Sequence, residues 1–263
     1  MTLNKDLAPF YNRVYKKGEK RHYTSLLFSG HKQPLAKEMV LAAVSWRGKR
    51  VLDAGCGTGR MAYLIARRGA REVLGADYSQ EAIAAAQGKY RAPNLSYRCA
   101  DIAALGGKYD AIVMLGTIEH LDRPLAILRR LARILAPGGS LIVTCPNWIN
   151  PRGYILMTLF HIFGAPVTLA DLHYLTPVEF EKWARSLKMK LTWKTADQGW
   201  AHGEKCLRDL ARRLPNVFRD SRLSPTPAGV DNFLRWLGEH MVRLEKDTRY
   251  GGAVGFYHLH KPR

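Results

Sequence analysis

The stretch VLDAGCGTGR, residues 51–60, places three glycines within five positions, directly after an apolar run that contains an aspartate. A short apolar run followed by a helix-period stretch, here GRMAYLIARRGA at 59–70, predicts a β-strand that leads into a helix. Glycine has no Cβ, so the loop between them can turn sharply and let a ligand approach the backbone. In an open parallel sheet, such a loop lies at the edge where ligands bind.

Two common glycine-rich fingerprints do not fit this loop. A dinucleotide site requires G-x-G-x-x-G, whereas here Gly55, Gly57 and Gly59 alternate and Arg60 stands in place of the last glycine. The phosphate loop G-x-x-x-x-G-K-[ST] does not occur in the sequence either. A nicotinamide or flavin site is therefore disfavoured, and a tight structural turn is the alternative to a ligand site.

Apolar runs and helix-period stretches alternate between about residues 50 and 145, which predicts an α/β fold whose parallel sheet is covered by helices on both faces. The strands are expected at 50–55, 72–77, 95–101, 109–116 and 140–146, and beyond them at 190–195 and 251–261. The helices are expected at 34–44, 59–70, 79–90, 124–135 and 176–189.

The chain of 263 residues is long enough to bury one substantial core. We expect one domain over residues 48–263, preceded by a helical N-terminal extension or lid over 1–47, with insertions at about 146–176 and 199–249 that form the acceptor side. The apolar segment 154–164 in the first insertion is too short to span a bilayer. It is expected to lie in a membrane interface, to cover the acceptor, or to pack as a plain buried helix.

The chain carries 41 Lys and Arg against 22 Asp and Glu, a formal net charge of +19. Such a surface attracts anions, but net charge alone does not choose among nucleic acid, acidic membrane and anionic substrate. The sequence contains no RNA-binding signature, which makes nucleic acid the less favoured partner. Four single cysteines and an N-terminus without a secretory pattern predict a cytoplasmic protein, with peripheral contact to an anionic membrane as an open alternative.

Three successive expected strands end in acid, at Asp53, Asp77 and Asp101. Because the ends of parallel strands meet at one edge, three carboxylates would face one crevice and repel each other, unless a ligand brings hydrogen-bond donors and positive charge. S-adenosylmethionine offers an ammonium, a sulfonium, a ribose diol and an adenine amine, without phosphates that the acids would repel. Exposed carboxylates at strand ends are the alternative.

The segments VLDAGCGTG, LGADYS, CADI, YDAIVMLGTIEHL and LAPGGSLIVTCPN resemble, in order and spacing, the successive motifs of class I S-adenosylmethionine-dependent methyltransferases. The resemblance covers about residues 48–148. It implies a Rossmann-like, seven-stranded sheet whose strand seven is antiparallel and lies between strands five and six.

The resemblance also implies roles for single residues. Asp53 would orient the methionine amine of the cofactor, Asp77 would hold its ribose, and Asp101 would meet the adenine amine. Gly55 and Gly57 would approach the methionine portion. The other implied cofactor contacts, around the loop, the adenine and the sulfonium, are Gly59, Tyr78, Ile102 and Leu115.

His120, just past the fourth expected strand, is the candidate general base because the pKa of a histidine lies near neutrality. The surrounding EHLDRP resembles the E-H-x-x-x-P of small-molecule methyltransferases, including the ubiquinone-biosynthesis O-methyltransferase family. A structural histidine that caps the following turn is the alternative. Members of that family carry a second glutamate, where this chain has Gly116, and Glu119 with His120 alone makes a poor site for a hard cation. We therefore expect no metal.

Three residues are candidate contacts to the acceptor: Tyr23 in the N-terminal extension, and His173 and Tyr174 in DLHYLTPVEF. Ordinary packing is the alternative role for each of them.

The sequence thus predicts an enzyme that moves a methyl group from S-adenosylmethionine to a hydroxyl of a small, rather apolar acceptor, quinone-like, polyketide or lipid-linked, and releases S-adenosylhomocysteine. The alternatives are a small-molecule N-methyltransferase, an RNA methyltransferase and a catalytically silent scaffold. The N/D-P-P tetrapeptide of amino-methylating nucleic-acid enzymes is missing, since Leu115 is followed by Gly-Thr-Ile.

Overall fold

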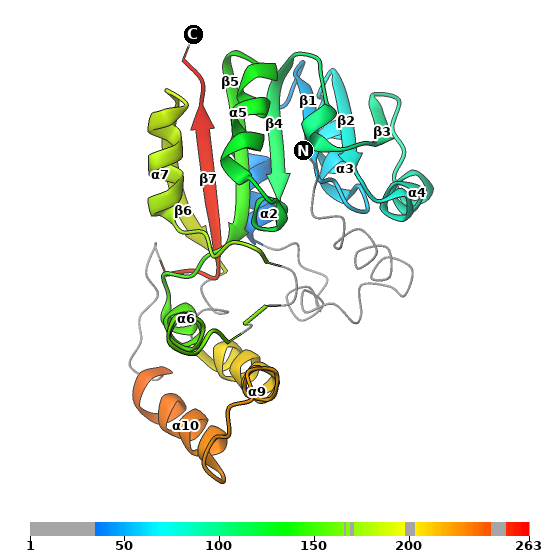
Figure 1. Ribbon diagram of the computed structural model, residues 1–263. Helices are drawn as coiled ribbons and strands as arrows, with labels where there is room; N and C mark the ends of the chain where they lie inside the picture. Colours follow the sequence, from blue (N-terminus) through cyan, green and yellow to red (C-terminus); the bar gives the residue numbers. More distant parts are fainter. Residues whose placement is uncertain (1–34, 166, 169–170, 198–202, 243–250, 263) are drawn as a thin grey trace. The chain divides into compact units, whose positions relative to one another are not determined.

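The computed structural model describes residues 35–165, 167–168, 171–197, 203–242 and 251–262. They form a seven-stranded sheet with the order β3-β2-β1-β4-β5-β7-β6, in which β7 runs antiparallel (Figure 1). The α/β fold and the antiparallel seventh strand between strands five and six are confirmed. The candidate Tyr23 lies outside the described residues.

The strands are β1 Arg50–Ala54, β2 Glu72–Asp77, β3 Leu95–Cys99, β4 Tyr109–Leu115, β5 Leu135–Pro146, β6 Lys190–Ala196 and β7 Val254–His260. β1 pairs in parallel with β2 on one side and β4 on the other, so that Leu52 lies opposite Leu74 and Ile112. The inner strands are buried on both faces, which explains why their sequences are continuous apolar runs and not alternating ones.

The helices are α2 Leu35–Ala42, α3 Arg60–Ala66, α4 Gln80–Lys89, α5 Pro124–Ile134, α6 Pro151–Phe163, α7 Pro177–Ser186, α9 Gly203–Asp220 and α10 Gly229–Leu237. Two short 3-10 turns, η3 Ile102–Ala104 and η4 Ile118–His120, follow β3 and β4, and a π turn, η5 Gly238–Val242, continues α10. In α5, Pro124 opens the first turn, where its missing N–H costs nothing, and the buried Leu128 and Leu131 face the core.

The fifth strand begins earlier than its apolar run predicts. It was expected from Ser140, but in the structure Leu135 already pairs with Tyr109, and Ser140 pairs with Ala111. Four residues of β5 therefore stand opposite one residue of β4, and they form a bulge that accommodates the APGG segment. Proline and glycine mark a turn in a sequence, but they do not exclude an irregularity inside a strand.

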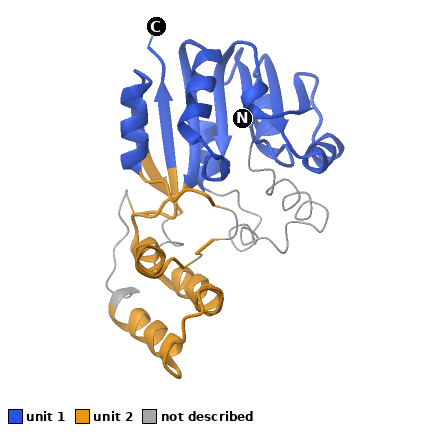
Figure 2. Cartoon of the chain, viewed as in Figure 1, with its two compact units in different colours: residues 1–145, 177–193, 256–263 blue, residues 146–176, 194–255 orange. Residues whose placement is uncertain are grey.

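The chain divides into two compact units (Figure 2). Unit 1 comprises residues 1–145, 177–193 and 256–263, and unit 2 comprises 146–176 and 194–255. The core of unit 1 gathers apolar side chains from β1, β2, β4 and α3, among them Val51, Val73, Ile65 and Val113. That of unit 2 is built by Leu156 of α6, Leu210 and Leu214 of α9, and Leu237 of α10.

A buried ion network joins α6 to α9 within unit 2. The carboxylate of Asp209 accepts two hydrogen bonds from Arg213, at 3.2 and 3.3 Å, and lies 3.6 Å from the guanidinium of Arg152. Burial lowers the pKa of Arg152, and the charge of Asp209 opposes that shift. Removing only one partner of such a network would leave an uncompensated buried charge.

Helix α6 exposes several large apolar or aromatic side chains. Its Leu156 is fully buried, whereas Tyr154, Ile162 and Phe163 are exposed. Among the described residues, no helix combines the length and the apolar character that crossing a membrane requires.

Lys261, which follows β7, stabilises the end of α5. Its Nζ donates to the carbonyl oxygens of Ala132, at 2.9 Å, and Leu135, at 2.8 Å. We expect Lys261→Met to lower the free energy of unfolding by about 1–2 kcal/mol, because two charge-assisted bonds at a helix carboxyl end are lost. Urea denaturation measures this change, with the exposed neighbour variant His260→Ala as the control. Equal midpoints for the two variants would contradict the stabilising role.

Candidate functional site

The loop between β1 and α3 has a backbone that favours glycine at three positions. Gly55, Gly57 and Gly59 have φ angles of +80°, +51° and +80°, in the left-handed region that side chains with a Cβ rarely adopt. A Cβ on Gly55 would also overlap the side chain of Thr117. The alternating glycines are therefore required by the turn itself and by the close approach of η4.

Asp53, in β1, is a buried carboxylate with spare hydrogen-bonding capacity. It is 1% exposed, and its Oδ2 is buried without a hydrogen-bond partner. Burial raises the pKa of Asp53 to about 7, the backbone N–H of Ala62 opposes this rise, and the nearby Asp77 adds to it. Since an unpaired buried polar atom is costly, this oxygen fits a ligand that brings a donor or a positive charge.

Asp77, at the end of β2, is tied to the glycine loop. Its Oδ2 accepts a hydrogen bond from the backbone N–H of Gly57 at 2.9 Å, and its Oδ1 accepts one from that of Ser79 at 3.0 Å. Burial raises the pKa of Asp77, and these hydrogen bonds oppose the shift. Ser79 in turn caps α4, because its hydroxyl accepts from the N–H of Ala82 at 3.1 Å. The loop, β2 and α4 are thus joined at one carboxylate.

The remaining cofactor candidates lie at or just beyond the carboxyl ends of β2, β3 and β4. Asp101 caps η3, since its Oδ1 accepts from the N–H of Ala103 at 2.8 Å, and the adjacent Ile102 is buried. Burial raises the pKa of Tyr78. Leu115 is the last residue of β4, and its carbonyl oxygen accepts from the hydroxyl of Thr117 at 3.2 Å. All these candidates belong to unit 1.

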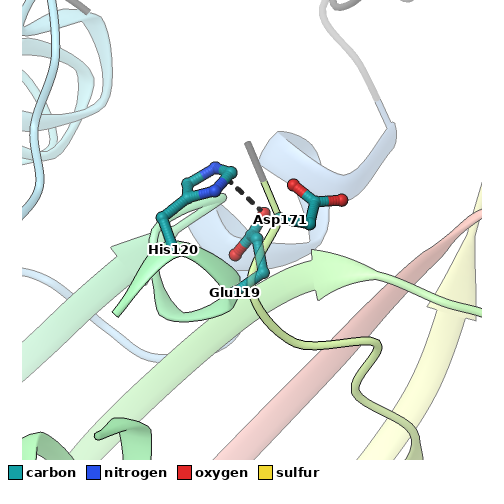
Figure 3. A group of neighbouring side chains, drawn as sticks. All are labelled: Glu119, His120 and Asp171. Carbon is teal, nitrogen blue, oxygen red and sulfur yellow. Dashed lines mark ion pairs between the residues drawn. The ribbon is translucent and has the colours of Figure 1, made fainter. Parts of the chain in front are cut away.

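Glu119 and His120 lie side by side in η4 (Figure 3). The Oε1 of Glu119 is 3.9 Å from the Nε2 of His120, and Glu119 is only 3% exposed. A buried carboxylate at this distance can orient the imidazole and balance a positive charge that forms on it. Gly116, just before η4, has a φ of +58°, which favours glycine. Figure 3 also draws Asp171, which belongs to unit 2.

The acceptor candidates His173 and Tyr174 belong to unit 2. The ring of Tyr174 packs edge-on against Trp148 and Phe160, with centroid distances of 5.0 and 4.6 Å. Burial raises the pKa of its hydroxyl. These contacts account for the position of Tyr174 by packing, and a contact of either residue with an acceptor stays a prediction.

Two residues of the site were not found from the sequence. Thr117 packs against Gly55, and Tyr97 of β3 donates from its hydroxyl to the carbonyl oxygen of Gly59 at 3.1 Å. One signal was available for Tyr97. An aromatic residue in the third strand can pack over a glycine in the neighbouring strand, and Gly75 in the second strand is such a glycine.

Residues 51–139 match a family described as a methyltransferase domain. The ubiquinone biosynthesis O-methyltransferase of Dechloromonas aromatica is 30% identical over 171 residues, which cover 60% of this chain and 71% of that protein. The protein with the same name from Alkalilimnicola ehrlichii is 34% identical over 158 residues, which cover 55% of this chain and 62% of that protein.

Solved structures show the same fold at low identity. Magnesium protoporphyrin IX methyltransferase from Synechocystis PCC 6803, with bound S-adenosylhomocysteine, has a TM-score of 0.58 at 16% identity, over 97% of this chain and 98% of that one. A possible histamine N-methyltransferase from Thermotoga maritima has a TM-score of 0.59 at 17% identity, over 97% and 99%.

The raised pKa of Asp53 predicts a pH dependence of stability in the ligand-free protein. Between the ordinary value of 3.8 and about 7, the folded protein holds a proton that the unfolded chain has lost. The contribution of Asp53 to the free energy of unfolding is therefore greatest below pH 3.8, falls as the pH rises towards 7, and is level above that.

We expect Asp53→Asn to remove this dependence. As the pH rises from 4 to 7.5, the free energy of unfolding of the variant should increase relative to that of wild type by up to about 4 kcal/mol, which is the energetic equivalent of the pKa difference. Urea denaturation of both proteins across this range measures the gain, and Asp122→Asn, at an exposed position, is the control. Parallel pH profiles for wild type and Asp53→Asn would show that the carboxyl is ionised in the folded state.

Proposed function

Because the chain belongs to the class I S-adenosylmethionine-dependent methyltransferases, we propose that it methylates a hydroxyl of a small, rather apolar acceptor. The chain is a methyltransferase that uses S-adenosylmethionine. The single observation that carries the location of the site is the buried, unpaired oxygen of Asp53 beside the glycine loop.

The residues present fit the cofactor. Asp53 offers an unpaired oxygen to the ammonium, and the bare loop lets the methionine portion approach Gly55 and Gly57. Asp77 accepts from the backbone N–H groups of Gly57 and Ser79, and because a carboxylate has about four acceptor positions, it can also accept from a ribose hydroxyl. Gly59, Tyr78, Asp101, Ile102 and Leu115 complete the proposed cofactor contacts.

When bound, S-adenosylmethionine supplies a methyl group that its positively charged sulfur activates for displacement. The protein's own tasks are then to position the acceptor and to remove its proton. We assign the proton to the imidazole of His120. Glu119 orients this ring and balances the charge that the proton brings.

The acceptor class rests on the relatives, which are named ubiquinone biosynthesis O-methyltransferases. A quinone-like or otherwise lipid-linked phenol would agree with the exposed apolar side chains of α6. We also propose peripheral contact with an anionic membrane, because α9 exposes Lys205, Arg208 and Arg212 at helical spacing along one face.

His120→Ala tests the proposed base. Cofactor affinity should stay nearly intact, since the cofactor contacts lie elsewhere, while turnover should fall about a hundredfold or more. Calorimetric titration with S-adenosylhomocysteine and initial rates measure the two effects. His260→Ala, at an exposed position, is the control. Unchanged turnover would leave His120 with a structural role.

Methylation of cell extracts, followed by mass spectrometry, tests the acceptor class. We expect a gain of one CH₂ on a hydroxyl of an apolar small molecule. Methyl transfer to tRNA or rRNA with a steep salt dependence, or to a small-molecule amine, would overturn the proposed acceptor. No binding of S-adenosylhomocysteine by wild type would overturn the proposed cofactor site as well.

A further inference from the structure

Tyr97 links the third strand to the glycine loop. It stands opposite Gly75 in the parallel pairing of β2 and β3, and its hydroxyl donates to the carbonyl oxygen of Gly59 at 3.1 Å. That same oxygen accepts the backbone N–H of Tyr63 at 3.0 Å, an early hydrogen bond of α3. The hydroxyl therefore bonds to the carbonyl at which the loop becomes a helix.

Two glycines make room for the Tyr97 side chain. A Cβ on Gly75 would lie 2.7 Å from the ring carbon Cδ1, and a Cβ on Gly59 would lie 2.5 Å from the hydroxyl oxygen. Real Cβ atoms do not approach other heavy atoms so closely, so a larger residue at either position would displace the ring. The tyrosine and the two glycines thus form one packing unit, in which the ring fills the space that the missing side chains leave.

Hydrogen bonds hold the loop at both of its ends. Gly55 and Cys56 donate to the carbonyl oxygen of Ala76 at 2.8 and 3.0 Å, and Gly57 donates to Asp77 at 2.9 Å. These bonds fasten the first half of the loop to β2. The N–H of the final glycine, Gly59, donates to the carbonyl oxygen of Cys56 at 2.9 Å, and Tyr97 adds a bond to the carbonyl oxygen of Gly59 from a different strand.

We propose that Tyr97 is a positioning residue for the cofactor, which holds Gly59 in the conformation that S-adenosylmethionine binds. The inference rests on the proposed cofactor site. Glycine loses more conformational freedom on ordering than any other residue, so a loop with three glycines would lose affinity if it had to order on binding. Tyr97 removes part of this cost in advance. It acts through the loop, and the acceptor and the methyl transfer do not depend on it.

Tyr97→Phe tests the proposal, because it keeps the ring that packs on both glycines and removes only the hydroxyl. We expect the Kd for S-adenosylhomocysteine and the KM for S-adenosylmethionine to rise about fivefold, the effect of one neutral hydrogen bond. The kcat at saturating cofactor and the KM for the acceptor should stay at their wild-type values. A merely structural tyrosine would not produce this split.

Tyr109→Phe is the matched control. Tyr109 is a buried tyrosine at the amino end of the central strand β4, whereas the proposed cofactor contacts lie near the carboxyl ends of the strands. Its variant should therefore bind S-adenosylhomocysteine as wild type does.

Hydrogen exchange provides a second readout. The amides of residues 57–61 should exchange faster in ligand-free Tyr97→Phe than in wild type, and S-adenosylhomocysteine should narrow the difference. An unchanged Kd in Tyr97→Phe, with wild type binding normally, would overturn this inference and leave the proposed function standing. A fall in kcat with an unchanged Kd would overturn it too. Wild type that does not bind S-adenosylhomocysteine would instead remove the proposed site on which the inference rests.

Discussion

The site depends on the buried carboxylate of Asp77. Its hydrogen bonds to the backbone of Gly57 and Ser79 bring the glycine loop, the end of β2 and the start of α4 to one point. Asp53 lies close enough for the charges of the two acids to interact, and both are buried. The ligand-free protein therefore holds two acids with raised pKa values in a place that disfavours their ionisation. In the proposed site, a ligand with an ammonium and a sulfonium would favour ionisation of both acids, so the carboxylates that lower the stability of the ligand-free protein would strengthen cofactor binding.

The division into two units also divides the proposed roles. Every proposed cofactor contact and the Glu119–His120 pair belong to unit 1, whereas His173 and Tyr174 belong to unit 2. The matched methyltransferase family covers 51–139, which lies wholly within unit 1. If the proposed roles hold, the residues for cofactor binding and proton removal lie in the part of the chain that matches the family, and the candidate acceptor contacts lie outside it. Within unit 2, the ion pair of Arg152 with Asp209 links α6 to α9.

Much of unit 1 could be predicted from the sequence, because its strands are buried apolar runs and its loops carry glycine and strand-end acids. The bounds of β2, expected and found at 72–77, follow from such local patterns. The bulge in β5 could not be predicted, since it depends on which residue of β4 lies opposite. Tyr97, Thr117 and the ion pair of Arg152 with Asp209 were missed for the same reason. Each acts on a partner that is distant in sequence, and no periodicity reports such a partner.

The position of β7 has a consequence for how the protein is made. β7 lies between β5 and β6 in the sheet, yet it follows β5 by more than a hundred residues along the chain, and α9 and α10 come before it. During synthesis on the ribosome, the backbone groups of β5 and β6 that pair with β7 therefore gain their native partners only after β7 has been synthesised. Until then they stay unpaired, and such unpaired strand edges can form non-native pairings with other strands.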